Sequence, residues 1–391
     1  MVKYTRKLKM NLPPHQSAFL WGARKTGKST YLAENFPSSV RYDLLQSELY
    51  LKFTSRPQLF REEILALSPQ ELTHPIIVDE IQRIPLLLNE IHWLIENTKA
   101  SFILCGSSAR KLKQCSANLL GGRAWKYHFY PLVSAEIPDF NLLQALNTGL
   151  IPSHYLSPNP QKSLQAYIED YLTEEIRAEG LTRNLPAFSR FLDSLMFCDG
   201  ELVNFTNISR ECGIDAKTAK SYYEILVDTL IGYFIFPFSK TKGRNTIAAT
   251  PKFYLFDVGT AGYLAKRKIN ILKGAEAGKA FENFILMELL AYRGINDCNY
   301  TIKFWRTKSG QEVDFILGNC EVAIEAKISD SVTTRDIRGL IIFTDEYKPK
   351  KSIVVSLDTR RRKIKTSAEN EIIILPYQEF LSMLWKKAII A

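Results

Sequence analysis

The chain has 391 residues, a length that predicts two or three domains rather than one core. Its composition, 46% hydrophobic and 12% aromatic, is typical of globular proteins and argues against intrinsic disorder. No apolar run reaches the roughly 18 residues of a membrane helix, and the basic N-terminal stretch lacks the apolar core of a secretory signal. The six cysteines form no C-x-x-C pair. We expect a cytoplasmic protein with no membrane partner, zinc site or disulfide framework.

The net charge of +10 is unevenly distributed. Between residues 236 and 275 there are eight basic residues against one acid, Asp257. A second basic run occupies residues 360–365. Basic stripes suit a polyanion such as a nucleic acid, although a solvated surface explains them equally well. The eight residues are Lys240, Lys242, Arg244, Lys252, Lys266, Arg267, Lys268 and Lys273.

The first motif follows residues 17–21, which predict a short buried strand. Residues 22–29 match G-x-x-x-x-G-K-[ST], and residues 30–35 predict a helix, the order that a phosphate-binding loop requires. Glycines allow a close approach to phosphate, and N–H groups at a helix N-terminus favour an anion. We expect Lys28 to contact the β- and γ-phosphates of ATP and Ser29 to bind Mg²⁺. A glycine-rich turn with an incidental Lys-Ser is the alternative. The predicted nucleotide-binding residues here are Gly22, Ala23, Arg24, Lys25, Thr26, Gly27, Lys28, Ser29 and Thr30.

A second apolar run, residues 74–78, ends at Asp79 and Glu80, about fifty residues after the loop. Central parallel strands are buried on both faces, so they consist of continuous apolar residues. At the carboxyl end of such a strand Asp79 would bind Mg²⁺. Glu80 would polarise the attacking water as the catalytic base. The sequence therefore predicts ATP hydrolysis with ATP and Mg²⁺ as cofactors.

A third predicted strand, residues 101–105, leads into Ser107 and Ser108. Either serine could sense the γ-phosphate at this edge of the sheet, or cap a following helix, which serine also favours. Arg123 follows two glycines and is a candidate arginine finger that acts on the nucleotide of a neighbouring subunit. That role would require a homo-oligomer. A solvated loop arginine fits the pattern equally well.

The middle of the chain has a helical pattern. Residues 167–179 predict an amphipathic helix, and residues 208–222 predict two helices joined by a turn at Gly213. The second helix is expected to begin at Asp215. If this helix-turn-helix meets DNA, the side chains facing the groove are those of Lys217, Thr218 and Lys220. The alternative is a winged-helix fold used only for packing between domains.

The last part of the chain predicts a β-hairpin. Residues 312–317 and 320–327 are strands, and Gly-Asn at 318–319 is typical of a two-residue turn. With this turn Asp314 lies opposite Ala323. The hairpin therefore fixes which polar side chains share one face of the sheet.

The side chains of Asp314, Glu325 and Lys327 share that face. The two carboxylates are expected to be diagonal neighbours about 7–8 Å apart, close enough to bind one Mg²⁺. Lys327 could position water or neutralise phosphate charge, which is the layout of a metal-dependent nuclease. Glu282, on a predicted helix, could supply a third metal-binding carboxylate. Cross-strand charge pairing, and a surface acid for Glu282, are the alternatives.

These motifs together resemble the AAA-type ATPases of bacteria and archaea that carry a C-terminal domain of unknown function. The resemblance covers nearly the whole chain. Its C-terminal part is similar to the PD-(D/E)XK nuclease fold, whose Asp, Glu-x-Lys and helix Glu match Asp314, Glu325–Lys327 and Glu282. Glu312-Val313 stands where that motif has Pro-Asp. The resemblance rests on Gly22–Ser29, Val78–Glu80, Gly106–Ser108, Gly121–Arg123, Pro131–Leu132, Glu136, Phe281–Asn283, Trp305–Arg306, Glu312–Phe315 and Glu325–Lys327.

The chain is thus predicted to be α/β, in three parts. Residues 1–140 are expected to form a parallel-sheet AAA-type P-loop domain, residues 141–250 a helical and winged-helix-like region, and residues 251–391 a PD-(D/E)XK-like domain. The favoured function is ATP hydrolysis coupled to metal-dependent cleavage of nucleic acid, DNA more than RNA. One alternative is an ATPase switch that binds nucleic acid or protein through an inactive C-terminal domain. A nucleotide-binding scaffold with little turnover is the other.

Overall fold

The computed structural model describes residues 4–108, 110, 120–172, 184–195, 198–239 and 250–390. It divides into two compact units. The N-terminal unit comprises residues 5–131 together with 225–231, and the C-terminal unit comprises residues 1–4, 132–224 and 232–391. Among the helices described, none is both long enough and apolar enough to cross a membrane.

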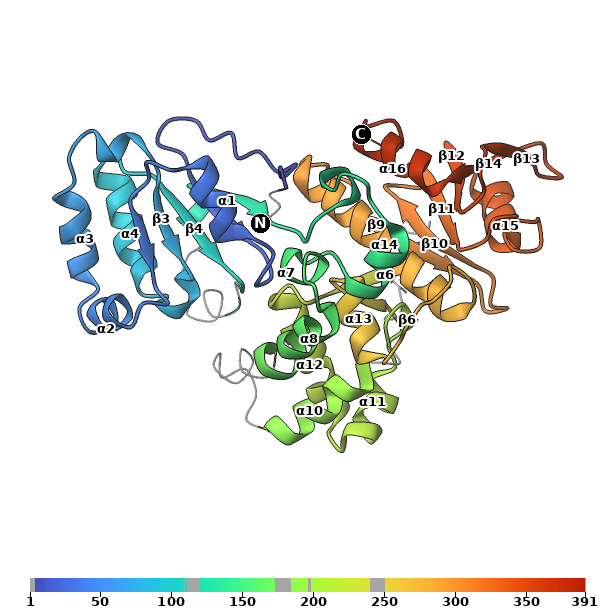
Figure 1. The fold of residues 1–391 in the computed structure, drawn as a ribbon, viewed down its shortest axis with the longest axis horizontal. Helices are drawn as coiled ribbons and strands as arrows, with labels where there is room; N and C mark the ends of the chain where they lie inside the picture. Colours follow the sequence, from blue (N-terminus) through green and yellow to red (C-terminus); the bar gives the residue numbers. More distant parts are fainter. Residues whose placement is uncertain are drawn as a thin grey trace. The chain divides into compact units, whose positions relative to one another are not determined.

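The N-terminal unit is built on a five-stranded sheet in which all neighbouring strands are parallel (Figure 1). The strand order is β2-β3-β4-β1-β5, so β4 separates β1 from β3. The predicted α/β class with a parallel N-terminal sheet is confirmed. The strands are β1 (Ser17–Trp21), β2 (Arg41–Asp43), β3 (Ile76–Asp79), β4 (Phe102–Gly106) and β5 (Ala124–His128).

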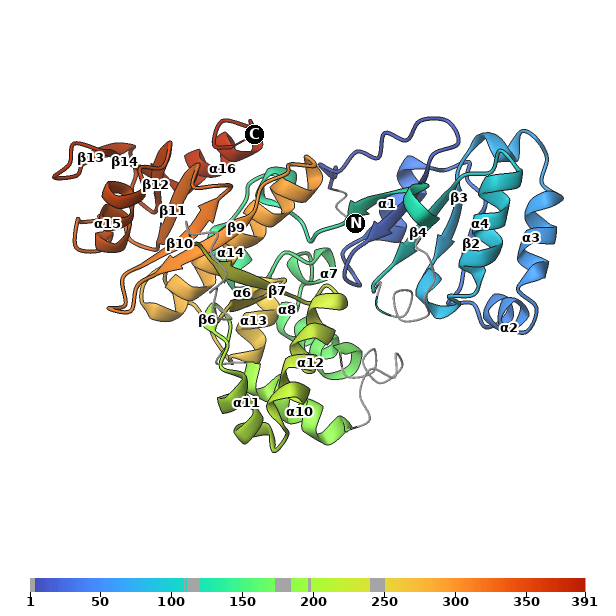
Figure 2. The same cartoon turned by 180° about the vertical axis from the view of Figure 1, so that it is seen from behind.

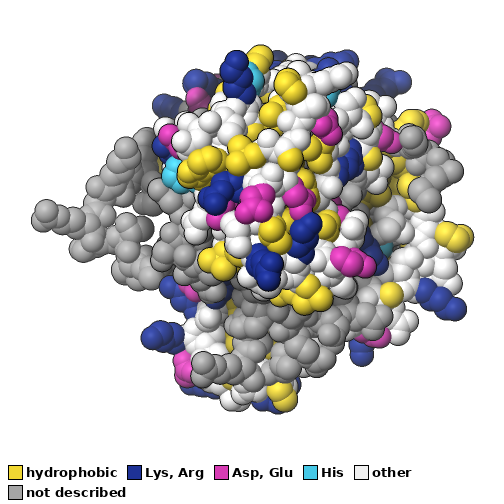
Figure 3. Space-filling view, turned by 90° about the vertical axis from the view of Figure 1, so that its left-hand side faces the viewer, with side chains coloured by type: hydrophobic (Ala, Val, Ile, Leu, Met, Phe, Trp, Pro, Cys, Tyr) yellow, Lys and Arg dark blue, Asp and Glu magenta, His cyan; other side chains and the backbone are white. Residues whose placement is uncertain are grey.

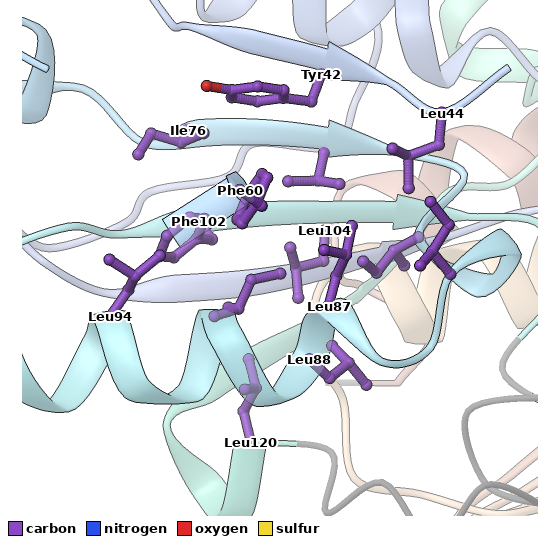
Figure 4. Close-up of a cluster of buried hydrophobic side chains, with 14 of the residues drawn as sticks. Tyr42, Leu44, Phe60, Ile76, Leu87, Leu88, Leu94, Phe102, Leu104 and Leu120 are labelled. Atoms are coloured by element: carbon purple, nitrogen blue, oxygen red, sulfur yellow. The ribbon is translucent and has the colours of Figure 1, made fainter. Parts of the chain in front are cut away.

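Helices cover both faces of this sheet. The α-helices are α1 (Lys28–Asn35), α2 (Ser47–Ser55), α3 (Gln58–Leu65) and α4 (Leu87–Asn97), with short 3-10 turns η1 (Glu71–Thr73), η2 (Ile81–Arg83) and η3 (Leu120–Gly122). Apolar side chains of α3 and α4, such as Phe60 and Leu94, pack against strand side chains such as Phe102 and Leu104 (Figure 4). Helix α1 covers the opposite face (Figure 1). Burial on both faces explains why β1, β3 and β4 are continuous apolar runs.

The C-terminal unit contains a nine-stranded mixed sheet in the order β13-β14-β12-β11-β10-β9-β7-β8-β6. Strands β11, β12 and β14 are parallel, whereas β9, β10 and β11 form an antiparallel meander. The strands are β6 (Glu201–Leu202), β7 (Gly232–Pro237), β8 (Lys252–Leu255), β9 (Ile302–Arg306), β10 (Glu312–Leu317), β11 (Val322–Lys327), β12 (Lys351–Ser356), β13 (Arg362–Lys365) and β14 (Glu371–Pro376).

Three helices pack on the C-terminal part of this sheet. Helix α14 (Ala275–Ile295) lies against β11, α15 (Arg338–Tyr347) against β10 and β11, and α16 (Tyr377–Trp385) against β14 and β12 (Figure 1). The chain order here is helix, three strands, helix, strand. A buried cluster that includes Trp305, Leu340 and Phe343 fills the side covered by α15.

The middle of the chain is helical, as predicted. Its elements are η4 (Ser134–Glu136), α6 (Leu142–Thr148), α7 (Pro152–Tyr155), α8 (Pro160–Gln165), η5 (Ala166–Leu172), α10 (Leu185–Ser194), α11 (Phe205–Cys212), α12 (Ala216–Asp228) and α13 (Val258–Leu264). The amphipathic helix expected at 167–179 begins as the π-helical turn η5, and residues 173–183 lie outside the described residues.

Helices α11 and α12 form the expected helix-turn-helix, beside α10 (Figure 2). Gly213 ends α11 in the left-handed conformation, with φ of 65°. The Asp215 carboxylate then accepts the backbone N–H of Lys217 and of Thr218, each at 2.9 Å, and caps α12. Phe188 and Tyr222 pack at 4.9 Å between ring centroids and hold α10 against α12.

Candidate functional site

The loop between β1 and α1 has the geometry of a phosphate-binding loop. Gly27 adopts φ of 98°, and α1 begins at the next residue. A Cβ on Gly22 would lie 2.4 Å from the carbonyl oxygen of Phe129, so only glycine fits there. Lys28 is buried, and its Nζ donates to the carbonyl oxygens of Gly22 at 2.6 Å and Ala23 at 3.1 Å. In the described part of the chain Lys28 forms no ion pair, so its charge is free to meet a phosphate.

The two predicted Mg²⁺-binding residues of this unit lie together. The Ser29 hydroxyl donates to Asp79 Oδ2 at 2.7 Å, although 50 residues separate them in the sequence. Strand β3 delivers Asp79 to the carboxyl edge of the sheet, where α1 begins. A hydroxyl and a carboxylate oxygen fit Mg²⁺, which completes its shell with water and phosphate oxygens.

Glu80 is buried and has φ of 57°, an unfavourable value for a residue with a side chain. Such strain clusters at functional sites. Its Oε2 accepts hydrogen bonds from Gln82 Nε2 and, at 3.4 Å, from the Ser107 hydroxyl. Arg24 of the loop lies 3.8 Å from the same oxygen. These contacts fix the carboxylate of the predicted catalytic base.

Sequence reasoning missed two residues of this site. Gln82 is buried and also donates to the Ser107 hydroxyl at 3.0 Å, so it joins β3 to β4. Its signal was a polar side chain in the short segment Ile81–Ile84, directly after Asp79 and Glu80. Arg6 donates to Thr26 O at 2.8 Å and to Tyr130 O at 2.6 Å, which joins the loop to the segment after β5. No local pattern marks Arg6.

The other predicted nucleotide-site residues are placed differently. Ser108 is buried beside Ser107, whereas Lys25 and Thr30 are exposed. The Arg123 guanidinium forms an ion pair with Glu96 of α4 within the same unit. Its role as an arginine finger therefore stays a prediction.

The hairpin register differs from the prediction. Leu317 pairs with Val322 and Phe315 with Ile324, so the turn spans residues 318–321 rather than 318–319. Gly318 and Cys320 both adopt positive φ, of 65° and 72°, which a four-residue turn accommodates. The predicted partner of Asp314, Ala323, is therefore wrong.

Continuing the observed register places Asp314 opposite Glu325. A shift of two residues preserves the face of every side chain, so the predicted grouping on one face is unaffected. Residues directly opposite each other on antiparallel strands are closer neighbours than the diagonal pair that was expected. Asp314 Oδ2 accepts the backbone N–H of Ala326 at 2.8 Å, and Lys327 Nζ lies 2.7 Å from Glu325 Oε1.

Burial and like charge dominate the electrostatics of this pair. Burial, followed by the charges of Glu325 and Glu282, raises the pKa of Asp314 well above its usual range, while Lys327 and Lys252 oppose the rise. Burial also raises the pKa of Glu325, and Lys327 opposes that rise. Two facing buried carboxylates of raised pKa are a donor set that a divalent cation would stabilise.

Glu282 has other partners. Its Oε1 accepts from Lys252 Nζ at 3.0 Å and from the Tyr254 hydroxyl at 2.5 Å. Among the described residues, no three His, Cys, Asp or Glu side chains are arranged to hold a metal ion. The third metal-binding carboxylate thus stays a prediction. Lys252, counted with the basic surface in the sequence, is buried.

The candidate nucleic-acid surfaces are only partly exposed. On α12, Lys217 and Lys220 are exposed, whereas the Thr218 hydroxyl donates to Asp215 Oδ2 at 2.6 Å. In the run 360–365, four basic residues form ion pairs with neighbouring acids. On the face in Figure 3, basic, acidic and apolar side chains are interspersed. Lys240, Lys242 and Arg244 lie outside the described residues.

Three family models match successive parts of the chain. Residues 14–137 match the model of an AAA domain, and residues 139–270 match a domain of unknown function (DUF8612). Residues 277–380 match a second domain of unknown function (DUF4143). None of the curated proteins matches the chain.

Among solved structures, one similar chain is the Orc1 protein of Aeropyrum pernix in complex with DNA. It is 12% identical, and the match covers 64% of this chain and 86% of that one, with a TM-score of 0.24. The parallel sheet, the loop at residues 22–29 and the AAA-domain match agree with one another. Residues 14–137 are an AAA-type P-loop α/β domain.

Proposed function

We propose that this protein hydrolyses ATP with Mg²⁺ in its N-terminal unit and uses the turnover to control a metal-dependent nuclease-like site in its C-terminal unit. The observation that carries the ATPase part is the 2.7 Å hydrogen bond between Ser29 and Asp79, next to the buried Glu80. These groups come from the start of α1 and the carboxyl end of β3 and meet at one edge of the sheet.

Each residue of the nucleotide site has a distinct role. Lys28 and the N-terminus of α1 neutralise the phosphates. Ser29 and Asp79 hold Mg²⁺, which supplies charge neutralisation for the departing phosphate. Glu80 accepts the proton of the attacking water, and the Gln82–Ser107 pair keeps its carboxylate in place.

The Glu80→Gln variant tests the ATPase. It should bind ATP like the wild type while kcat falls by about 10²–10⁴-fold, because only the proton acceptor is lost. ATP binding is measured by calorimetry and phosphate release by a coupled assay. Unchanged turnover would show that the protein is a nucleotide-binding scaffold.

The nuclease part rests on Asp314, Glu325 and Lys327. Their facing arrangement on β10 and β11, with raised carboxyl pKa values, supports binding of a divalent cation and cleavage of a phosphodiester in nucleic acid. Exposed Lys217 and Lys220 on α12 support DNA as the partner. The order α10, β6, α11, α12, β7, β8 supports a winged helix there.

A second candidate is an ATPase switch whose C-terminal site no longer cuts. It is favoured by the lack, among the described residues, of a three-ligand metal group. Cleavage of single- and double-stranded DNA and RNA with Mg²⁺ or Mn²⁺ and ATP distinguishes the two. Activity that Asp314→Asn abolishes supports the nuclease, and no cleavage on any of these substrates supports the switch.

Three further assignments extend the same proposal. Ser107 senses the γ-phosphate through its contact with Glu80. Arg123 acts on the nucleotide of a second copy, once it leaves Glu96. The domain boundaries at 140 and 250 mark the regions that carry the nucleotide site, the helix-turn-helix and the carboxylate site.

A further inference from the structure

Lys252 opens β8, in an otherwise apolar stretch followed by three buried residues. Only 4% of its surface is exposed. Its Nζ donates to Glu282 Oε1 at 3.0 Å and forms an ion pair with Glu312 Oε1. These two contacts pair the buried amine, as an ammonium, with two carboxylates.

The carboxylates around it are neutralised unequally. Glu282 has Lys252 and the Tyr254 hydroxyl, and Glu312 has Lys252 and, at 3.1 Å, Arg306. A buried charge is costly unless it is paired, so these contacts fix where both carboxylates lie.

Asp314 is neutralised least. Its hydrogen-bond partner is the backbone N–H of Ala326, and within the described residues it forms no ion pair. Glu325, which faces it, has Lys327 at 2.7 Å. The Asp314–Glu325 pair thus has one ion-paired cation, Lys327, for two carboxylates.

We propose that Lys252 is an internal cation that holds Glu282 and Glu312 on its amine, so that the C-terminal site takes a single divalent cation at Asp314 and Glu325. The positive charge of Lys252 stands where a second metal ion would otherwise bind. This inference rests on the metal-binding part of the proposed function, and it assigns Lys252 as a positioning residue.

The proposal also makes the site composite. Lys252 and Tyr254 lie within the stretch that matches the first domain of unknown function, whereas the carboxylates lie within the second. Strand β8 reaches the carboxylates because it belongs to the same nine-stranded sheet. Neither matched region contains the whole site.

Mn²⁺ binding to the nucleotide-free, full-length chain tests the proposal, by electron paramagnetic resonance titration. All variants carry Asp79→Asn, which removes metal binding at the nucleotide site. The variants are Lys252→Met, Lys252→Gln as a more polar replacement, Lys252→Arg, and Lys252→Met combined with Glu282→Gln. Lys279→Met is the matched control, because Lys279 lies on α14 but forms an exposed ion pair with Glu201.

The parent, which carries Asp79→Asn alone, should bind one Mn²⁺ ion, and adding Asp314→Asn should abolish this binding. Lys252→Met and Lys252→Gln should bind a second ion, at least about tenfold more tightly than any second ion of the parent. Adding Glu282→Gln should remove it, and Lys252→Arg and Lys279→Met should resemble the parent. Mn²⁺ should also raise the Tm of Lys252→Met more than that of the parent.

The inference is overturned if Lys252→Met and Lys252→Gln, both folded by circular dichroism, bind no additional ion. A parent that binds no Mn²⁺ at all would instead count against the proposed nuclease site. The titration still tests the role of Lys252 in that case. A Mn²⁺ ion that binds to Lys252→Met, and no longer binds once Glu282→Gln is added, supports the role. If Lys252→Met gains no Mn²⁺ ion, the role is refuted.

Discussion

The two candidate sites contrast in how their lysines are partnered. In the N-terminal unit the buried Lys28 donates to two backbone carbonyls of its own loop. In the C-terminal unit Lys252 and Lys327 pair with carboxylates. Only Lys28 keeps its charge available for an external anion.

The N-terminal site can therefore receive an anionic ligand, whereas most charges of the C-terminal site are already paired with one another. The phosphate loop is formed by consecutive residues, and its own backbone carbonyls hold Lys28. Its geometry therefore does not require a carboxylate. The C-terminal group is assembled from α14, β8, β10 and β11, and buried charges there need partners to remain in place. Removing a lysine should therefore have opposite consequences in the two units.

The largest expected effect is on stability, in Lys252→Met. Leaving Glu282 and Glu312 without their shared cation should lower the free energy of unfolding by about 3–5 kcal/mol. Lys279→Met, which breaks an exposed pair, should cost at most about 1 kcal/mol. Denaturant unfolding of both variants checks this, with Lys28→Met as the comparison from the other unit. Equal losses of unfolding free energy in Lys252→Met and Lys279→Met would contradict the predicted difference between a buried and an exposed ion pair.

A carboxylate held without a lysine sharpens the comparison. Glu288 on α14 accepts from Ser134 N at 2.6 Å and Trp385 Nε1 at 2.8 Å. Burial raises its pKa to about 7, despite these hydrogen bonds, with Glu136 adding to the rise. Between the ordinary glutamate pKa and pH 7 only the folded state keeps the proton, so stability is highest below this window. The free energy of unfolding should fall, as pH rises through it, by on the order of 3 kcal/mol.

Glu288→Gln should remove this pH dependence, because the amide keeps the shape without titrating. Thermal unfolding at pH 5 and pH 8 should show a smaller decrease in Tm for the variant than for the wild type. Glu276→Gln, an exposed position on the same helix, is the control. Parallel pH profiles for the wild type and Glu288→Gln would contradict the prediction.

Lys28→Met tests directly whether the charge of Lys28 binds phosphate. The variant should lose about 100-fold in ATP affinity, because a charged hydrogen bond to phosphate contributes about 1.5–3 kcal/mol. The free energy of unfolding should fall less than in Lys252→Met, since two backbone carbonyls lose a donor but no buried carboxylate loses its cation. Calorimetric titration with a non-hydrolysable ATP analogue measures the affinity, with Lys99→Met as a surface control. Retained affinity would show that the loop binds something else.

The smallest effect is expected for Gln82→Ala. This change removes one support of the Glu80 carboxylate but leaves the carboxylate itself, so kcat should fall about tenfold, less than when the base is lost. The KM for ATP should stay within about twofold, because Gln82 does not face the phosphates. Steady-state kinetics separates the two. A rise in KM alone would assign Gln82 to binding instead.

Much of the nucleotide site was predictable from the sequence because its information is local. The loop motif, and the apolar runs that precede Asp79 and Ser107, fix the strands and their carboxyl ends. Gln82 was missed because its role depends on Ser107, 25 residues further on, and Arg6 because its partners lie up to 125 residues away in the chain. Contacts of that range leave no spacing pattern.

The C-terminal site was predictable in its members but less so in its geometry. Alternation along two strands placed Asp314, Glu325 and Lys327 on one face, and the fold agrees. The turn length depends on backbone conformation at Gly318 and Cys320, which a dipeptide preference did not determine. Lys252 was counted with the basic surface because residues 236–275 were judged by their charge alone.

The hairpin register has a consequence for sequence variation in related chains. The observed pairing between β10 and β11 differs by two residues from the predicted pairing, which changes the residues that lie directly opposite one another but not the face on which each side chain lies. Slippage by an even number therefore keeps these side chains on one face, whereas slippage by one residue would turn Glu325 and Lys327 to the opposite face. Relatives that keep this site should differ in the loop at 318–321 in ways that leave strand parity intact.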